Sequence, residues 1–285
     1  MGNLARRVVV AVIGIPVAAF LVWVGELPLA LFLAVAGGLG ASELYRLARQ
    51  RRARPFDAPG IAVAAATPLV LHLARLDLLR APLALAMVLF VVIIGLAVWS
   101  RAPDQEPLAS IAITVFGALY CSGTLAFGYA LRHHDWAVGA AAGTALVGFP
   151  LVITWANDIG AYAVGRAIGK RKLMPAVSPG KTVAGAVGAA LVAMVVAYLY
   201  NAAVLRPWAQ LALTPWSALA VGLVLSGAAQ VGDLAESLLK REAGVKDSSH
   251  LLPGHGGVLD RLDSLYFVLP VAYLLLGRLL LPAPR

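Results

Sequence analysis

Long apolar stretches, separated by short polar segments, follow one another along the whole chain of 285 residues. A helix needs about 20 mostly apolar residues to cross the hydrocarbon core of a bilayer. We expect a membrane-spanning helix in each of nine stretches: 7–25, 28–46, 60–77, 82–100, 107–131, 136–156, 183–205, 215–236 and 264–281. Glycine and proline inside such stretches are tolerated where neighbouring helices satisfy the backbone. The pattern therefore predicts an all-α, polytopic membrane protein.

Composition supports this class. The chain is 61% hydrophobic and 13% charged, with a mean hydropathy of +0.85, which is more apolar surface than a soluble domain needs. Arg6 and Arg7 precede the first stretch and no small-residue cleavage site follows it, so we interpret it as a retained helix. The single cysteine, Cys121, excludes a disulfide within the chain and disfavours a thiolate metal site.

A net charge of +9 can indicate a nucleic-acid partner, but the usual distribution of basic residues in membrane proteins explains it without one. Basic residues concentrate in cytoplasmic loops of membrane proteins. With a cytoplasmic N-terminus and nine helices, 17 of the 23 lysines and arginines fall in cytoplasmic segments. We therefore expect the C-terminus outside and the protein in the inner membrane of a bacterium. Its polar segments would face the cytoplasm and the anionic headgroups of membrane lipids.

Polar residues are distributed differently in the two halves of the chain. Residues 1–150 have few polar groups beyond loop charges, so we expect about five scaffold helices facing lipid, with Glu43 at the membrane interface. In residues 151–285, polar residues fall inside or beside helices, and all five lysines lie between residues 170 and 246. Lysine supplies a compact point charge that suits phosphate. We therefore expect the catalytic site in this second half. The alternative is that the clustering of the five lysines is a coincidence.

The segment 154–173 places polar groups on one helical face. Tyr162 and Arg166 follow Asp158 at i+4 and i+8, and Asn157 lies beside it. An ionisable group at membrane depth is costly and commonly functional. The alternative is an interfacial carboxylate paired with Arg166. Small residues at four-residue spacing on this segment would let another helix approach closely.

The segment 175–185 reads PAVSPGKTVAG and ends in a GKT tripeptide. A phosphate-binding loop of the ATPase type needs a glycine where Pro175 stands, and no strand precedes it, so that interpretation fails. Ser178, Lys181 and Thr182 form a turn directly before a helix, where free N–H groups and the helix dipole attract anions. An ordinary helix N-cap explains the serine or threonine equally well.

Two further polar segments follow near the C-terminus. Gln230, Asp233, Ser237 and Lys240 recur along one helical stripe, with Glu236 near Asp233, and an amphipathic exit helix is the alternative. Glycines at 254, 256 and 257 allow close approach to a ligand. Asp260 and Asp263 then follow at i and i+3, and such carboxylates together with phosphates are ligands that Mg²⁺ prefers. A histidine at position 255 suits phosphate better than Mg²⁺, which avoids nitrogen.

Together these residues resemble the phosphatidate cytidylyltransferase family, also called CDP-diacylglycerol synthases. The family signature is a serine, Lys-Arg, Lys-Asp, His-Gly-Gly, then Asp-Arg and Asp. It matches at every fixed position: Ser237, Lys240, Arg241, Lys246, Asp247, His255, Gly256, Gly257, Asp260, Arg261 and Asp263. The resemblance covers about residues 154–265. Family members often carry a lysine, an aromatic residue and a glutamate where this chain has Gly180, Val183 and Ala184.

The resemblance implies that CTP and phosphatidic acid react to give CDP-diacylglycerol and pyrophosphate, with Mg²⁺ as cofactor. A second metal or a monovalent cation stays open, and the small-residue faces are compatible with a homodimer. The implied roles, by residue, are the following: Asp233 and Asp260 hold the metal, with Asp247 and Asp263 secondary; Lys181, Lys240, Arg241, Lys246 and Arg261 hold phosphates; Ser178 and Thr182 donate to phosphate; His255, Gly256 and Gly257 shape the nucleotide loop; Asn157, Asp158, Tyr162 and Arg166 line the lipid entrance.

Other classes of function fit parts of the pattern. A kinase or cytidylyltransferase for another lipid phosphate or isoprenoid would use the same charges. A secondary transporter would also bury carboxylates, but near the bilayer midplane and with repeated architecture, and we find no internal repeat. A membrane scaffold gives no reason for the charge cluster.

Overall fold

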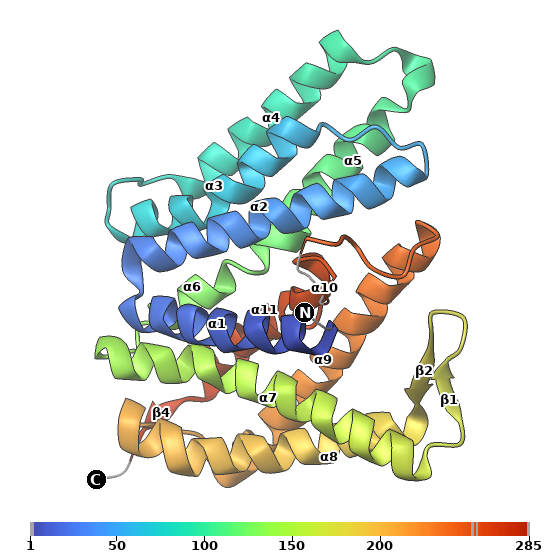
Figure 1. Ribbon diagram of the computed structural model, residues 1–285. Coiled ribbons are helices and arrows are strands. Elements are labelled where there is room, and N and C mark those ends of the chain that lie inside the picture. The colour runs from blue at the N-terminus through green and yellow to red at the C-terminus, as the bar shows by residue number, and fades with distance from the viewer. Residues whose placement is uncertain (1–2, 252–253, 255, 284–285) are drawn as a thin grey trace. The chain divides into compact units, whose positions relative to one another are not determined.

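The computed structural model describes residues 3–251, 254 and 256–283, and helices dominate it (Figure 1). Short 3-10 or π-helical turns, η1–η3, interrupt or extend some of the helices. The elements are α1 (Asn3–Val24), α2 (Glu26–Gln50), α3 (Asp57–Arg75), α4 (Pro82–Ser100), η1 (Pro103–Gln105), α5 (Pro107–Ala118), η2 (Leu119–Gly123), α6 (Phe127–Arg132), α7 (Gly139–Ile168), β1 (Lys172–Met174), β2 (Ser178–Thr182), α8 (Val183–Tyr200), η3 (Asn201–Ala209), β3 (Leu211–Ala212), α9 (Pro215–Glu242), α10 (Leu259–Leu262), α11 (Leu265–Leu279) and β4 (Leu281–Pro282).

Within this described part, eight helical segments are long and apolar enough to cross a membrane. They are Glu26–Gln50, Asp57–Arg75, Pro82–Ser100, Pro107–Arg132, Gly139–Ile168, Val183–Ala209, Pro215–Glu242 and Leu259–Leu279. Each coincides with one of the predicted stretches, which confirms the all-α, polytopic class. The first predicted stretch falls on α1, whose side chains are described from Val12 onward as a shorter apolar helix.

The chain divides into two compact units. The first holds the chain up to Tyr129 together with Leu239–Leu262, and the second holds Ala130–Leu238 together with the chain from Asp263 onward. The division predicted at residue 150 concerned function, and it stays a prediction.

In the first unit, α2, α3, α4 and α5 lie side by side (Figure 1). Tyr45 of α2 is fully buried, and its hydroxyl donates to the carbonyl oxygen of Thr114 at 2.6 Å. The phenol fits because Gly60 of α3 and Gly117 of α5 face it, and a Cβ on either would overlap the ring. Two glycines therefore let three helices close around one aromatic side chain.

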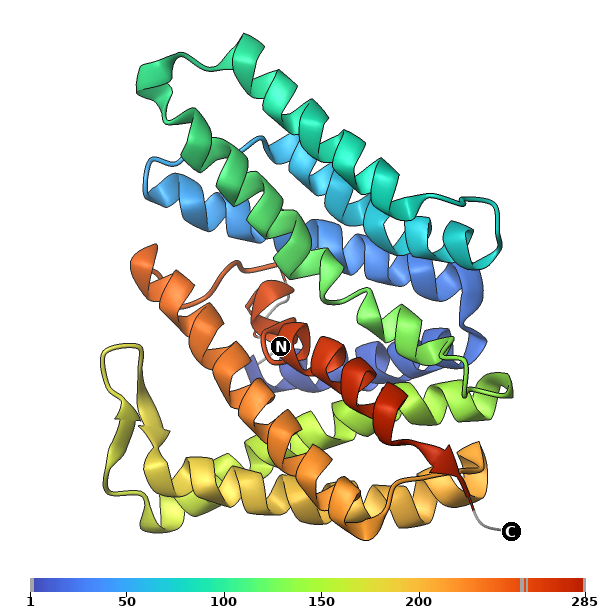
Figure 2. The same cartoon turned by 180° about the vertical axis from the view of Figure 1, so that it is seen from behind.

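In the second unit, α7 and α8 pack along their length (Figure 2). A Cβ on Gly160 of α7 would lie 2.9 Å from the Val192 side chain, and one on Gly188 of α8 would lie 2.5 Å from Val164. Glycine on each helix thus faces a β-branched residue on the other. Close approach through small residues is the usual way in which helices associate in lipid.

Two short antiparallel strand pairs, one of them a hairpin, were not predicted. β1 pairs with β2, with Lys172 opposite Thr182, and β3 pairs with β4. Residues 175–182 were expected to form only a turn before a helix. Prolines at 175 and 179 disfavour helix, so the chain after α7 turns back as a hairpin and enters α8 from strand β2.

The apolar stretch predicted at 136–156 covers only part of α7, and the polar end of this helix agrees with the helical spacing of Asp158, Tyr162 and Arg166. The helix continues beyond residue 156 to Ile168. Polar residues at 157 and 158 marked the end of the apolar stretch, but Ser226 of α9 donates to Asn157, which donates in turn to Asp158. The extra three turns bring the polar face of α7 to the hairpin.

Candidate active site

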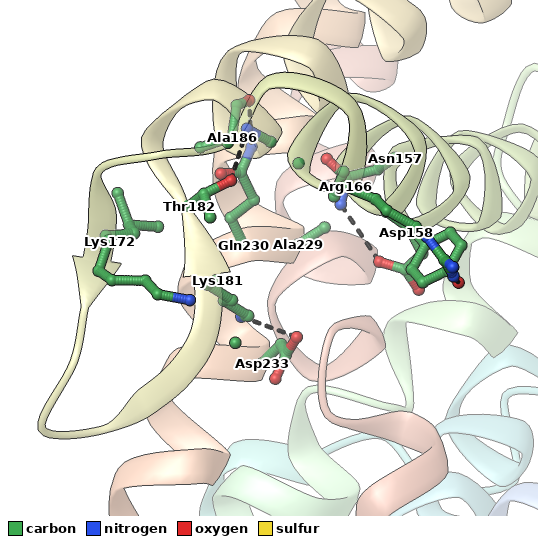
Figure 3. Close-up of a pocket in the computed structure, with 17 residues that line it drawn as sticks. Asn157, Asp158, Arg166, Lys172, Lys181, Thr182, Ala186, Ala229, Gln230 and Asp233 are labelled. Carbon is green, nitrogen blue, oxygen red and sulfur yellow. Dashed lines mark hydrogen bonds and ion pairs between the residues drawn. The ribbon is translucent and has the colours of Figure 1, made fainter.

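A pocket of about 440 Å³ opens between the last turns of α7, the β1–β2 hairpin, the start of α8 and the middle of α9 (Figure 3). A volume in this range is typical of sites for small ligands. Its polar lining consists of Asn157, Asp158, Tyr162, Arg166, Lys172, Lys181, Thr182, Gln230 and Asp233. The fold therefore brings together three of the four sequence segments that were expected to form the site.

The predicted polar face of α7 forms one wall of this pocket. Arg166 Nη1 donates to the hydroxyl of Tyr162 at 2.6 Å, and the guanidinium carbon lies 5.8 Å from the ring centroid. Asn157 Nδ2 donates to Asp158 Oδ1 at 3.3 Å. The four side chains share the wall as the helical spacing required, whereas their contact with lipid stays a prediction.

A row of buried and half-buried polar side chains connects α9 to α7. Gln230 Nε2 donates to Ser226 Oγ at 3.0 Å and to the carbonyl oxygen of Ala186 at 3.3 Å. Ser226 Oγ donates in turn to Asn157 Oδ1 at 2.6 Å, and both residues are buried. This row fixes the amide of Asn157 beside the Asp158 carboxylate. Sequence reasoning missed Ser226, although a serine four residues before Gln230 on an apolar helix was an available signal.

Lys181 and Asp233 form an ion pair inside the pocket (Figure 3). Lys181 Nζ lies 2.7 Å from Asp233 Oδ2, and the side chains are 24% and 37% exposed. Ser237 Oγ donates to the other carboxylate oxygen at 3.4 Å. The strand β2 thus delivers a cation to the carboxylate of α9. The Asp233 side chain remains partly exposed, whereas the Nζ atom of Lys181 is itself buried.

Thr182 acts as the N-cap of α8. Its Oγ1 accepts a hydrogen bond from Gly185 N at 3.1 Å, and this confirms the interpretation as a helix cap. A Cβ on Gly165 of α7 would lie 3.0 Å from that hydroxyl, so α7 and the cap are in close contact. Binding of phosphate by Ser178 and Thr182 stays a prediction.

Asp260, in the first unit, is the centre of a hydrogen-bonded loop. Its Oδ2 accepts from Ser248 N at 2.9 Å, from Ser248 Oγ at 2.8 Å and from Gly257 N at 2.7 Å. Its Oδ1 pairs with Lys240 Nζ at 2.7 Å. Gly256 has a φ of +83°, and a Cβ there would lie 2.6 Å from Asp260 Oδ2. Glycine therefore lets the loop close onto this buried carboxylate.

Glu43 binds the same loop, and its place at the membrane interface stays a prediction. It is 5% exposed. Oε1 accepts from Ser249 Oγ at 2.6 Å and Val258 N at 3.1 Å, and Oε2 accepts from Ser248 Oγ at 3.0 Å and Leu259 N at 2.8 Å. These donors replace water around the carboxylate. They lie more than 200 residues away in sequence, so the helix pattern gave no sign of them.

The other predicted residues of the C-terminal loop are mostly at the surface. Exposed members are Arg241, Lys246, Asp247 and Arg261. Arg241 donates to the carbonyl oxygen of Val245 at 3.2 Å, and half-buried Asp263 accepts from Ser264 N at 2.6 Å. The helix is interrupted after Leu262, so Asp260 and Asp263 do not share one continuous helix. His255 lies outside the described residues.

The carboxylates fit a substrate-bound Mg²⁺ better than a metal caged by protein alone. Among the residues that the structure describes, no three His, Cys, Asp or Glu side chains are grouped to hold a metal ion. Mg²⁺ at nucleotide sites uses one or two carboxylates, and phosphates and water complete its shell. Asp233 suits this, since it is partly exposed on a pocket wall that carries cations. Asp260 offers the same oxygen chemistry, but Lys240 occupies its Oδ1.

Comparisons with known proteins identify the family of the chain. Residues 5–279 match the sequence profile described as the Cytidylyltransferase family. A protein of Bacillus subtilis (strain 168) named phosphatidate cytidylyltransferase is 32% identical over 279 residues, which is 97% of this chain and 99% of the relative. A Staphylococcus epidermidis protein of the same name is 47% identical over 128 residues, or 45% of this chain and 47% of the relative. One from Staphylococcus aureus (strain COL) is 45% identical over 130 residues, with the same shares of the two chains.

Proposed function

This chain belongs to the cytidylyltransferase family, and on that premise we propose that it transfers the cytidylyl group of CTP to phosphatidic acid. An oxygen of the lipid phosphate attacks the α-phosphorus of CTP. A new P–O bond forms as the bond from that phosphorus to the bridging oxygen breaks, and pyrophosphate leaves with the electron pair. The products are CDP-diacylglycerol and pyrophosphate. The lipid phosphate is already ionised at pH 7, so no side chain has to remove a proton from it.

The observation that carries this proposal is the pocket with its mixed charges. Transfer between phosphates depends on positioning and charge neutralisation more than on covalent catalysis. The cations Arg166, Lys172 and Lys181 line the cavity, and so do the carboxylates Asp158 and Asp233. Such a set is suited to hold two anionic substrates near each other while keeping carboxylates available for a cation.

We assign the nucleotide to the hairpin side and the lipid to the α7 side. Lys181 on β2 and Lys172 on β1 are the cations nearest the polar hairpin, where phosphates of CTP would bind. Tyr162 is 66% exposed and Ile159, one turn before it, is 69% exposed. An apolar surface beside Arg166 suits a lipid whose phosphate needs a cation and whose acyl chains need hydrocarbon.

Asp233 in the pocket would hold Mg²⁺ together with the phosphates, and the cation would supply charge neutralisation to the triphosphate when bound. Asp260, in the other unit, stays a predicted metal ligand. Each of these carboxylates now carries a lysine ammonium at 2.7 Å: Lys181 on Asp233 and Lys240 on Asp260. A divalent cation competes with these ammonium groups for the same oxygens. The displaced lysines are then available to phosphate, so metal and nucleotide should favour each other's binding.

We further propose that the N-terminus and the pocket face the cytoplasm, in the inner membrane of a bacterium. The bias of basic residues supports this orientation. CTP is a cytoplasmic solute, whereas the lipid phosphate lies at the membrane surface. A pocket at the ends of helices can receive both.

The test is an assay of the purified protein with radiolabelled CTP, phosphatidic acid and Mg²⁺. We expect a labelled lipid that depends on all three and is lost in Asp260→Asn. ATP in place of CTP, and an isoprenoid phosphate in place of phosphatidic acid, separate this activity from that of other lipid enzymes. A protein that labels another lipid, or uses ATP instead of CTP, would contradict the proposal.

A further inference from the structure

We propose that Glu43 of α2 is a positioning residue for the reaction, because it holds the loop 248–259 that presents Asp260. The role of Asp260 rests on the proposed function, whereas the contacts of Glu43 do not. The N-terminal helices are then part of the catalytic machinery and more than a scaffold. No element of the sequence signature includes this glutamate.

The Glu43 carboxylate accepts hydrogen bonds from four donors, all within residues 248–259. Two are hydroxyls, of Ser248 and Ser249, and two are backbone amides, of Val258 and Leu259. They come from both ends of the loop, at distances of 2.6 to 3.1 Å. A carboxylate that is 5% exposed cannot replace lost donors by water. Glu43 therefore ties the two ends of the loop together.

Ser248 connects this tie to Asp260. Its Oγ lies 3.0 Å from Glu43 Oε2 and 2.8 Å from Asp260 Oδ2. A hydroxyl has one proton to donate, so the two carboxylates compete for it. The backbone amide of Ser248 also donates to Asp260. A displacement of Ser248 thus changes the surroundings of Asp260 directly.

Gly257 and Arg46 also contribute to the contact between α2 and the loop. A Cβ on Gly257 would lie 2.6 Å from the Glu43 carboxyl carbon, so the loop passes directly over this side chain. Arg46, three residues after Glu43 on α2, donates through Nη2 to the carbonyl oxygen of Ser248. One face of α2 therefore binds Ser248 by its hydroxyl and by its backbone.

Glu43→Gln is the informative variant because it keeps the size of the side chain. The amide supplies one acceptor oxygen and one NH2 group, and that NH2 group must face a loop donor. Glu26→Gln is the matched control on the same helix, where the carboxylate accepts from Arg75 Nη1 at 3.0 and 2.9 Å. Ser249→Ala is a milder variant that removes one donor, and Ser249→Thr keeps the hydroxyl.

Hydrogen–deuterium exchange of the loop 248–259 in the intact protein gives a readout that is independent of activity. We expect the amides of Val258 and Leu259 to exchange at least about tenfold faster in Glu43→Gln, since a hydrogen bond to a charged group is lost. Ser249→Ala should show a smaller increase in the same peptide. Glu26→Gln and Ser249→Thr should match the wild type.

Measurement of kcat distinguishes a positioning role of Glu43 from a purely structural one. We expect kcat per folded molecule to fall at least about tenfold in Glu43→Gln while KM for phosphatidic acid is unchanged. Unchanged exchange of the loop in both Glu43→Gln and Ser249→Ala would overturn the proposal, as would faster exchange with wild-type kcat. A wild-type protein without cytidylyltransferase activity would defeat the proposed function, and the exchange data would still decide whether Glu43 holds the loop.

Discussion

Replacing Lys181 by methionine tests whether its ammonium alternates between Asp233 and phosphate. The substitution keeps an unbranched apolar side chain one atom shorter and removes the charge together with its hydrogen-bond donors. Both partners are partly exposed, at 24% and 37%, so the pair contributes about 0.2–1 kcal/mol to stability. The free energy of unfolding should therefore change little. Lys170→Met is the control, because Lys170 is exposed and lies outside the pocket lining.

In Lys181→Met, the apparent affinity for Mg²⁺ and the kcat/KM for CTP should change in opposite directions. Without the ammonium, Asp233 is freed for a divalent cation, and the pair energy corresponds to an apparent Mg²⁺ affinity up to about fivefold higher. A contact between an ammonium and phosphate contributes about 1.5–3 kcal/mol, so kcat/KM for CTP should fall about 10- to 100-fold.

The assay is a titration of Mg²⁺ at fixed CTP, followed by a titration of CTP at saturating Mg²⁺. Thermal unfolding in detergent measures the stability of the same preparations. A Lys181→Met protein with wild-type kcat/KM for CTP, or with weaker apparent Mg²⁺ affinity, would refute the reasoning. Equal losses in Lys170→Met would show that total charge matters more than position.

Three further predictions concern the metal carboxylate, the packing and a histidine. Asp233→Asn should abolish labelled-lipid formation at any Mg²⁺ concentration while the protein keeps its melting temperature. Gly60→Ala should cost about 1–3 kcal/mol in thermal unfolding, because its Cβ would overlap Tyr45, whereas Gly227→Ala, with open space around it, should cost nothing. Burial lowers the pKa of His134 below its ordinary value. Its contribution to stability is therefore complete above about pH 6.5 and is lost as the pH falls through the folded-state pKa, so His134→Asn should flatten the decline in melting temperature between pH 7.5 and 5.

The class of the fold was readable from the sequence because a bilayer imposes one simple requirement. A spanning helix must be apolar over about 20 residues, and that pattern is local. The residues at which the helices begin and end were harder to predict from the sequence. The apolar stretch before Asn157 ended where polar residues began, yet α7 continues, and Ser226 of the same unit provides a hydrogen-bond partner for Asn157. Hydrophobicity alone does not report such partners.

Part of the candidate site was also local. Helical spacing placed Asp158, Tyr162 and Arg166 on one face, and all three line the pocket. The cap at Thr182 followed from its position before a helix. These inferences needed only the geometry of one helix and its ends.

The contacts that give these residues their environment were decided by the tertiary structure. The pairing of Lys181 with Asp233 joins a strand to a helix 52 residues away in number, and Glu43 reaches a loop more than 200 residues later. A carboxylate near the end of an apolar helix is compatible with water, lipid headgroups or buried donors. The choice depends on which segments fold against it, and a one-dimensional pattern of polar and apolar residues does not contain that information. Sequence alone determined where helices and charges lie along the chain, and the packing of distant segments determined which charges meet.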